Sequence, residues 1–321
     1  MNGLHDALDP AGPQAAHIAE LWWLTLAICA VVFVLLLAAF LYALWHAPRA
    51  NAATPPDTSA LSVPEPGGRM AVSVAVAIAI VGLLALLVGS AATDRVLAHM
   101  PIDNALHIQV TGQQWWWAVT YDDPQPSRRF TTANEIHIPV GRPVVMTLQS
   151  GDVIHSLWVP NLHGKKDLIP GHITTIELRA DKAGTYRGQC AEFCGMQHAR
   201  MALDVVAEPA EAFAKWSDAQ RAPAPEPSGG PAARGRDLFL SGTCMMCHAV
   251  QGTTAAAHLG PDLTHVASRK WLGARTVPND PQHLADWISD PGHFKPGVQM
   301  PAHHVSRADL DALVAYVETL K

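Results

Sequence analysis

Cysteine is scarce in this chain, and its distribution argues against a disulfide framework. The 321 residues include five cysteines. Four of them lie in two short clusters, at 190–194 and 244–247, and the fifth, Cys29, lies in an apolar run where a small buried hydrophobe is expected. The two clusters are therefore better candidates for metal or cofactor binding than for structural cross-links.

Positive charge is lacking as well. The net charge of −6 gives no electrostatic footprint of a protein that binds nucleic acid. No internal repeat is present. The length predicts two or three structural units.

Two stretches, Leu21 to Trp45 and Met70 to Thr93, contain no Asp, Glu, Lys or Arg. At about 1.5 Å per residue, a helix over either stretch exceeds the roughly 30 Å hydrocarbon core of a bilayer. A cleavable signal peptide is the alternative for the first stretch, but the basic n-region is missing and the apolar run is too long. The pattern therefore predicts a two-helix transmembrane hairpin.

The distribution of basic residues predicts the orientation of this hairpin. No Lys or Arg precedes Leu21, whereas the loop 46–69 contains Arg49 and Arg69. By the positive-inside rule the loop is inside and both chain termini are outside. The loop is rich in proline, which is typical of a flexible connection.

A cluster of soft ligands follows at Cys190-Ala-Glu-Phe-Cys194-Gly-Met-Gln-His198-Ala-Arg-Met201, with His155 as a further imidazole upstream. Sulfur and imidazole together form a coordination set for transition metals. The second cysteine argues for two metal ions bridged by two thiolates, which indicates a dinuclear copper centre. A Cys190–Cys194 disulfide or a mononuclear Cys2His2 zinc site would use the same side chains, but neither explains Met201 or Glu192.

A second signature, Cys244-Met-Met-Cys247-His248, is typical of covalently attached haem c with the histidine as fifth iron ligand. A redox dithiol or zinc knuckle is made improbable by the adjacent histidine. We expect Met300 as the sixth ligand because a Met/His pair raises the reduction potential. The other candidates for this position are Met245, Met246, His258, His265, His293, His303 and His304.

Between these motifs the pattern changes from strands to helices. Short β-prone runs punctuated by turns predict an antiparallel β-sandwich or barrel from 103 to 206. The clearest of them are Leu106 to Val110, Glu135 to Pro139, Val144 to Leu148 and Thr174 to Leu178. A Pro-, Ala- and Gly-rich linker from 221 to 235 follows a short helix at 210–217. Helices are then expected at 236–240 and 309–320, as in an all-α cytochrome domain.

The segment from Ser150 to Met201 resembles subunit II of the haem-copper cytochrome c oxidases, in which this loop holds the CuA centre. The resemblance implies that two thiolates bridge the coppers and that Glu192 contributes its backbone carbonyl. It also implies that the Glu192 side chain reaches a Mg or Mn ion shared with subunit I. The implied copper ligands are His155, Cys190, Glu192, Cys194, His198 and Met201.

The resemblance also implies a multidomain membrane protein made of a two-helix transmembrane hairpin, an all-β cupredoxin-like barrel and an all-α class I cytochrome c domain. The expected division is 1–20 as a periplasmic N-terminal segment, 21–45 and 70–93 as transmembrane helices, 46–69 as a cytoplasmic loop, 94–219 as the periplasmic CuA domain, 220–235 as a linker and 236–321 as the cytochrome c domain.

Two further positions acquire an interpretation from this family. The aromatic run Gln114-Trp115-Trp116-Trp117 corresponds to one that lies over the copper centre, where the first tryptophan, here Trp115, accepts electrons. Read as a strand, the run places Trp115 and Trp117 on one face, and core packing alone explains one or two of these side chains. His172 replaces an arginine of the family that faces the subunit I haem propionates, which puts that salt link in doubt.

The family's activity is cytochrome c oxidation with reduction of oxygen to water, and subunit II relays electrons from a cytochrome c donor through its own haem c and CuA to the haems of subunit I. The implied partners are subunit I, subunit III, cytochrome c or quinol–cytochrome c reductase, and the lipid bilayer of a bacterial inner (plasma) membrane. A CuA subunit of a nitric oxide reductase and a membrane-tethered copper-handling protein are the alternatives from the sequence.

Overall fold

The structure, a computed structural model, describes residues 5–47, 49, 51–55 and 66–321. It divides into two units: residues 17–100 form one, and the N-terminal segment together with residues 101–321 forms the other. Each unit is described by itself.

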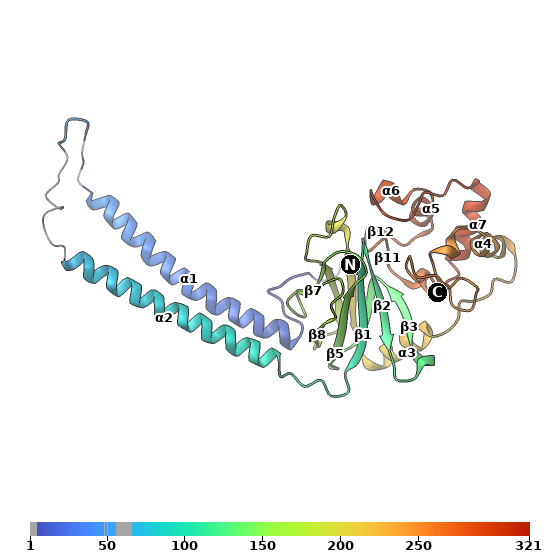
Figure 1. Cartoon of the computed structure of the whole chain (residues 1–321), viewed down its shortest axis with the longest axis horizontal. Coiled ribbons are helices and arrows are strands. Elements are labelled where there is room, and N and C mark those ends of the chain that lie inside the picture. The colour runs from blue at the N-terminus through green and yellow to red at the C-terminus, as the bar shows by residue number, and fades with distance from the viewer. Residues whose placement is uncertain (1–4, 48, 50, 56–65) are drawn as a thin grey trace. The chain divides into compact units, whose positions relative to one another are not determined.

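The first unit is a pair of long helices, α1 (Pro13–His46) and α2 (Pro66–Leu97), which run antiparallel to each other (Figure 1). Gly89 of α2 faces the side chains of Leu21 and Leu24 on α1. Both helices are long and apolar enough to cross a membrane. Each extends beyond the apolar run that predicted it, while half of the predicted loop 46–69, namely residues 48, 50 and 56–65, lies outside the described residues.

The second unit contains a β-domain, residues 106–220, made of two five-stranded sheets and a closing helix. One sheet has the order β3-β2-β1-β5-β8 and the other β4-β10-β9-β6-β7. Inward side chains of β1 alternate with outward ones, and Ile108, Val110, Trp117 and Tyr186 are among the residues buried between the sheets. The strands are β1 (Leu106–Gln113), β2 (Trp116–Asp122), β3 (Phe130–Ala133), β4 (Glu135–Pro139), β5 (Val144–Ser150), β6 (His155–Trp158), β7 (Lys166–Leu168), β8 (Thr174–Leu178), β9 (Gly184–Cys190) and β10 (Ala202–Glu208), followed by α3 (Ala210–Gln220).

The strand pairing is mixed, so the prediction of an antiparallel domain is wrong for two pairs. β1 pairs with β5 in parallel, and β10 pairs with β4 in parallel. Parallel neighbours require a long crossover connection. The chain provides one between β1 and β5, because β4 joins the opposite sheet on the way.

The N-terminal segment packs on the β-domain. The backbone N–H of Ala11 donates to the carbonyl of Asn161 over 2.7 Å, and the Ala11 carbonyl accepts from Asp181 over 2.7 Å. The Gln14 side chain accepts from the backbone N–H of Arg179 over 3.2 Å. Residues 11–15 are therefore held against the β-domain by backbone and side-chain hydrogen bonds.

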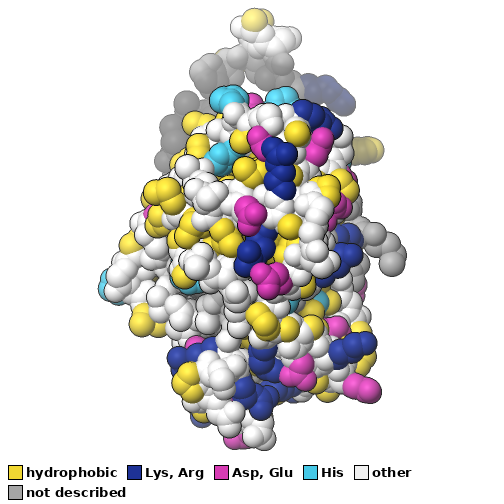
Figure 2. Space-filling view, turned by 90° about the vertical axis from the view of Figure 1, so that its right-hand side faces the viewer, with side chains coloured by type: hydrophobic (Ala, Val, Ile, Leu, Met, Phe, Trp, Pro, Cys, Tyr) yellow, Lys and Arg dark blue, Asp and Glu magenta, His cyan; other side chains and the backbone are white. Residues whose placement is uncertain are grey.

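A helical domain, residues 230–321, completes the unit (Figure 1). Its core includes Phe239, Leu313, Tyr316 and Val317, which pack α4 against α7. Charged side chains of both signs are interspersed over the face shown in Figure 2. The elements are α4 (Gly230–Ser241), η4 (Cys244–Met246), η5 (Val266–Ser268), β11 (Trp271–Leu272), β12 (Val277–Pro278), α5 (Pro281–Ser289), α6 (Pro291–Phe294) and α7 (Arg307–Val317).

Helix boundaries in this domain differ from the expected ones for local reasons. α4 begins at Gly230 rather than at 236, with a proline in its first turn, a favoured position because proline has no N–H to satisfy there. α7 begins two residues early because the Ser306 hydroxyl caps it by accepting from the N–H of Asp309.

The connection between the two domains is bonded to both. Arg221 Nε donates to the carbonyl of Arg128 in the β-domain over 3.0 Å. The N–H of Ala224 donates to the carbonyl of Gln251 in the helical domain over 2.9 Å. The segment before α4 is therefore held in place, although its composition predicts a flexible linker.

Candidate copper centre and haem site

The soft ligands predicted from the sequence converge at one end of the β-domain. β6 begins at His155 and β9 ends at Cys190, and the loop after β9 carries the remaining ligands. The thiols of Cys190 and Cys194 are free, and their Sγ atoms lie 3.7 Å apart, so these residues do not form a disulfide. The ligand atoms of His155, Cys190 and Cys194 all lie within 4.8 Å of one another.

The other predicted ligands lie around the two thiols. His155 Nδ1 is 3.9 Å from Cys190 Sγ, and His198 Nδ1 is 3.6 Å from Cys194 Sγ. The Met201 thioether lies 3.9 Å from Cys194 Sγ. The Cys190 thiol donates to the Glu192 carbonyl over 3.2 Å. All six predicted groups are thus brought together.

Asp152 holds the first imidazole in position. Its Oδ1 lies 2.7 Å from His155 Nε2, and its Oδ2 accepts from the backbone N–H of Gln114 over 2.6 Å. This contact directs Nδ1 of His155 toward the thiols. Asp152 was not among the site residues predicted from the sequence, and its place three residues before a candidate ligand was the available signal.

The electrostatics of this cluster favour a thiolate. The hydrogen bond between the Cys190 and Cys194 sulfur atoms is the main cause that lowers the pKa of Cys190 to about 3. The same interaction and burial raise the pKa of Cys194. Burial lowers the pKa of His155, but hydrogen bonds with Cys190 and Asp152 outweigh burial and leave it raised. A low thiol pKa prepares the site for a soft cation, since the thiolate is the ligand form.

Trp115 lies in the turn between β1 and β2, not in a strand as predicted. Its indole Nε1 donates to the Cys194 carbonyl over 2.9 Å, and the amide of Gln114 donates to the same oxygen over 2.7 Å. Trp117 on β2 is fully buried in the core. The alternation expected for a strand therefore does not apply to Trp115, which lies against the ligand loop.

Two predicted positions lie on the exposed surface of this chain. The Glu192 carboxylate is 3.3 Å from Lys165 Nζ, and Lys165 also contacts Asp167 over 3.1 Å. His172 is exposed in the turn before β8. Both side chains are accessible on the described chain.

The second predicted site lies in the helical domain after α4. Cys244 and Cys247 are free and half-buried. His248 Nδ1 lies 2.7 Å from the Pro261 carbonyl, so it carries the hydrogen and leaves Nε2 as the acceptor. Gly260 permits this arrangement, because a Cβ there would lie 2.6 Å from Cε1 of His248.

Burial is the main cause that lowers the pKa of His248, and the charge of Arg269 contributes. Neutral imidazole is the form that binds iron. Arg269 is itself 8 % exposed, and its Nε has no hydrogen-bond partner among the described residues.

The predicted sixth ligand is not joined to this histidine by any contact in the described structure. Met300 lies in the irregular segment between α6 and α7. His303 of the same segment is close enough for its charge to lower the pKa of His248, after the larger effects of burial and Arg269. Met246 inside the motif is 67 % exposed.

Two family models match the chain. The first, described as "Cytochrome C oxidase subunit II, periplasmic domain", matches residues 106–208, and the second, "Cytochrome c", matches residues 232–321. Cytochrome c oxidase subunit 2 of Alkalihalophilus pseudofirmus is 35 % identical over 98 % of this chain and 90 % of its own length. The chain belongs to the cytochrome c oxidase subunit 2 family.

Further relatives cover less of the chain. Cytochrome c oxidase subunit 2 of Bacillus subtilis is 29 % identical over 68 % of this chain and 63 % of its own length. The crystal structure of the periplasmic domain of subunit II of cytochrome oxidase from Bradyrhizobium japonicum covers 38 % of this chain and 97 % of its own, with 29 % identity and a TM-score of 0.35.

Membership in the cytochrome c oxidase subunit 2 family confirms the predicted fold class and the assignment to cytochrome c oxidase. As a member of the subunit 2 family, the chain associates with subunit I of a cytochrome c oxidase. It is a two-pass membrane protein with a periplasmic domain. The two matched domain types indicate CuA and haem c as its cofactors.

Proposed function

We propose that this subunit receives electrons from a cytochrome c or from a quinol–cytochrome c reductase and delivers them to the haems of subunit I, where oxygen is reduced to water. Within the chain, electrons pass from the helical domain to the copper cluster of the β-domain, with Trp115 beside the receiving site. The bound copper pair and haem each supply one-electron chemistry. The residues of the chain hold these groups, orient them and exclude water.

The convergence of six soft-ligand groups carries this proposal. Two free thiols 3.7 Å apart, each with an imidazole Nδ1 within 4 Å, fit two bridged ions better than one. The buried Met201 thioether favours copper over zinc, since thioether is a soft ligand. We propose His155, Cys190, the Glu192 carbonyl, Cys194, His198 and Met201 as the copper ligands.

The helical domain fits haem c by similar reasoning. Cys244 and Cys247 provide the thioether links, and His248 presents Nε2 to the iron. The buried Nε of Arg269 has no hydrogen-bond partner among the described residues, and a carboxylate of a bound haem would supply one. Met300 is proposed as the sixth ligand, on the segment that also carries His303.

The topology of the chain is part of the proposal. We propose that both termini and both redox domains are periplasmic in a bacterial inner membrane and that the loop 46–69 is cytoplasmic. The hydrogen bonds of Ala11 with Asn161 and with Asp181 support a common side of the membrane for the N-terminus and the β-domain. The sequence places the start of the β-domain at 94, the linker at 220–235 and the start of the cytochrome c domain at 236. Because α2 runs to Leu97 and α4 begins at Gly230, we propose 98–220 for the CuA domain, 221–229 for the linker and 230–321 for the cytochrome c domain.

We also propose that the Glu192 side chain reaches a Mg or Mn ion at the subunit I interface, and that subunit III belongs to the complex. The exposed Glu192 carboxylate, paired only with exposed Lys165 in the described chain, is available for a hard cation.

Electron paramagnetic resonance and optical spectroscopy on the full chain in detergent, expressed with haem attachment and loaded with copper, test the proposal. We expect a multi-line signal from one electron shared over two coppers and the absorption of covalent haem c. A mononuclear copper signal, or zinc in place of copper, would reject the relay.

A further inference from the structure

Lys295 of the helical domain is buried against the β-domain. The residue follows α6 and is 1 % exposed. Its Nζ donates to the Trp115 carbonyl over 2.6 Å and to the Gly273 carbonyl over 2.9 Å. A buried ammonium is costly unless its hydrogens are bonded. The bond to Gly273 lies within the helical domain, and the bond to Trp115 stabilises the contact between the domains.

The segment that carries Lys295 also covers the ring of Trp115. Gly297 has a φ of +84°, and a Cβ there would lie 3.3 Å from Met196 Sδ and 3.6 Å from Cη2 of Trp115. Trp115 is 8 % exposed. Its ring therefore lies between the copper-ligand loop and the helical domain, where another protein cannot contact it.

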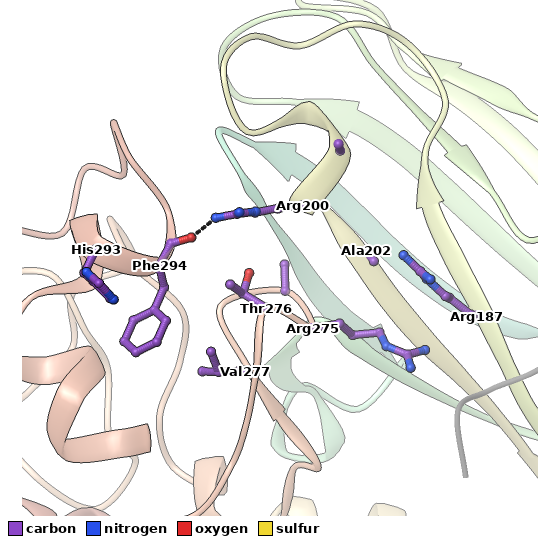
Figure 3. Close-up of a pocket in the computed structure, with 10 residues that line it drawn as sticks. Arg187, Arg200, Ala202, Arg275, Thr276, Val277, His293 and Phe294 are labelled. Atoms are coloured by element: carbon purple, nitrogen blue, oxygen red, sulfur yellow. Dashed lines mark hydrogen bonds between the residues drawn. The ribbon is translucent and has the colours of Figure 1, made fainter. Parts of the chain in front are cut away.

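The copper-ligand loop itself bonds to this segment. Gln197 Nε2 donates to the Pro296 carbonyl over 2.7 Å. The Arg200 guanidinium donates to the Phe294 carbonyl (Figure 3). Both residues flank His198, so the docking contacts act directly on the loop that carries the proposed ligands.

A second buried cation joins the domains beside the cavity of Figure 3. Arg275, between β11 and β12, forms an ion pair with Asp204 of β10, and the two side chains are 8 % and 3 % exposed. The N–H of Ala202 donates to the Ala274 carbonyl over 3.3 Å. Two separated charge-bearing contacts fix the orientation of one domain on the other, which a single contact would not.

We propose that Lys295 and Arg275 are positioning residues that hold the helical domain on Trp115, so that Trp115 accepts electrons from this domain only and is closed to an external cytochrome c. The inference rests on the proposed electron relay. With a haem held by Cys244, Cys247 and His248 and copper held by the loop after β9, one electron would pass from the first group to the second, so that the haem would be oxidised and the copper reduced with no bond made or broken.

Hydrogen exchange on the full chain in detergent tests the docking. In Lys295→Met, which keeps the apolar stem and removes the donor, we expect the amides of 113–118 and 294–298 to exchange about tenfold faster or more. The matched control is Lys215→Met, which removes an exposed lysine of α3 and should leave exchange as in the wild type.

Electron transfer in the assembled oxidase gives the second readout. After rapid photochemical reduction of the haem, the copper centre should be reduced at least about tenfold more slowly in Lys295→Met, with the spectra of both centres unchanged. An external cytochrome c that reduces the copper centre of the haem-free wild type directly would overturn the closed-site proposal.

A second variant keeps the test decisive if Lys295→Met does not fold. The double substitution Asp204→Asn with Arg275→Gln replaces the buried ion pair by two uncharged amides, of which the asparagine keeps the shape of Asp204 and the glutamine is shorter than Arg275. It should speed exchange at 202–204, 272–277 and 294–298. If the folded variants exchange their amide hydrogens at the wild-type rate, the inference is overturned. If the wild-type chain binds no copper pair or no haem, the proposed relay is overturned, and the exchange result still reports on the docking of the domains.

Discussion

The copper cluster and the haem site differ in how far the polypeptide alone assembles them. In the β-domain, two thiols, two imidazoles and a thioether already face one another, with the Asp152 carboxylate and the turn at Gln114 supporting them. In the helical domain only His248 is fixed, by Pro261, while Met300 lies on an irregular segment. The side chains that would bind two adjacent copper ions must converge on one place. The side chains that would bind a haem iron must stay apart, because the haem would lie between them.

The largest change in copper binding is expected from substitution of Cys194, whose Sγ lies within 4 Å of Cys190, His198 and Met201. We expect Cys194→Ser to abolish the two-copper signal and to reduce copper binding to roughly one ion or less, because a bridging thiolate is lost. Electron paramagnetic resonance and metal analysis measure this. Cys29→Ser on α1 is the control, and a persisting multi-line signal in Cys194→Ser would contradict the bridged centre.

The haem site should be changed next most strongly by Met300→Ala. We expect covalent attachment to persist and the haem midpoint potential to fall by on the order of 0.1 V or more, within the roughly 0.8 V that axial ligands span. Redox titration of the full chain measures the change. If His303→Ala produces the fall and Met300→Ala does not, the assignment moves to His303; Met246→Ala, at an exposed position, is the control.

Asp152→Asn tests the support of the copper cluster rather than its ligands. We expect copper affinity to fall about 10- to 100-fold, since the carboxylate that fixes His155 is replaced by a weaker acceptor. Competition with a copper chelator measures the affinity. Asp122→Asn at the exposed end of β2 should bind copper as the wild type does, and an unaltered affinity in Asp152→Asn would show that the loop alone fixes the imidazole.

The smallest effect on copper is expected for Glu192→Gln. The backbone carbonyl that faces Cys190 remains, so the copper signal should be unchanged. Manganese binding to the assembled oxidase should be lost, because a neutral amide is a weaker ligand for a hard cation. Manganese bound equally by both forms would remove Glu192 from that site.

Features that depend on residues close in sequence could be predicted, whereas contacts between residues distant in sequence could not. The ligand set and the haem motif depend on short spacings, and strands such as β4 and β8 have the bounds that their β-prone runs predict. The turn at Trp115, the parallel pairs and the burial of Lys295 arise from tertiary packing. Lys295 and Trp115 are 180 positions apart, and no local pattern marks a lysine that will be buried.

The bonded connection from Arg221 to Ala224 has a kinetic consequence. Because this segment is fixed at Arg128 on one side and at Gln251 on the other, the haem domain cannot diffuse away from its acceptor. Its effective concentration is set by geometry and exceeds the millimolar range of a short flexible tether. In the proposed relay, the electron-transfer step between the two domains is therefore unimolecular, independent of protein concentration and insensitive to ionic strength. We expect only the arrival of the proposed external donor to respond to salt.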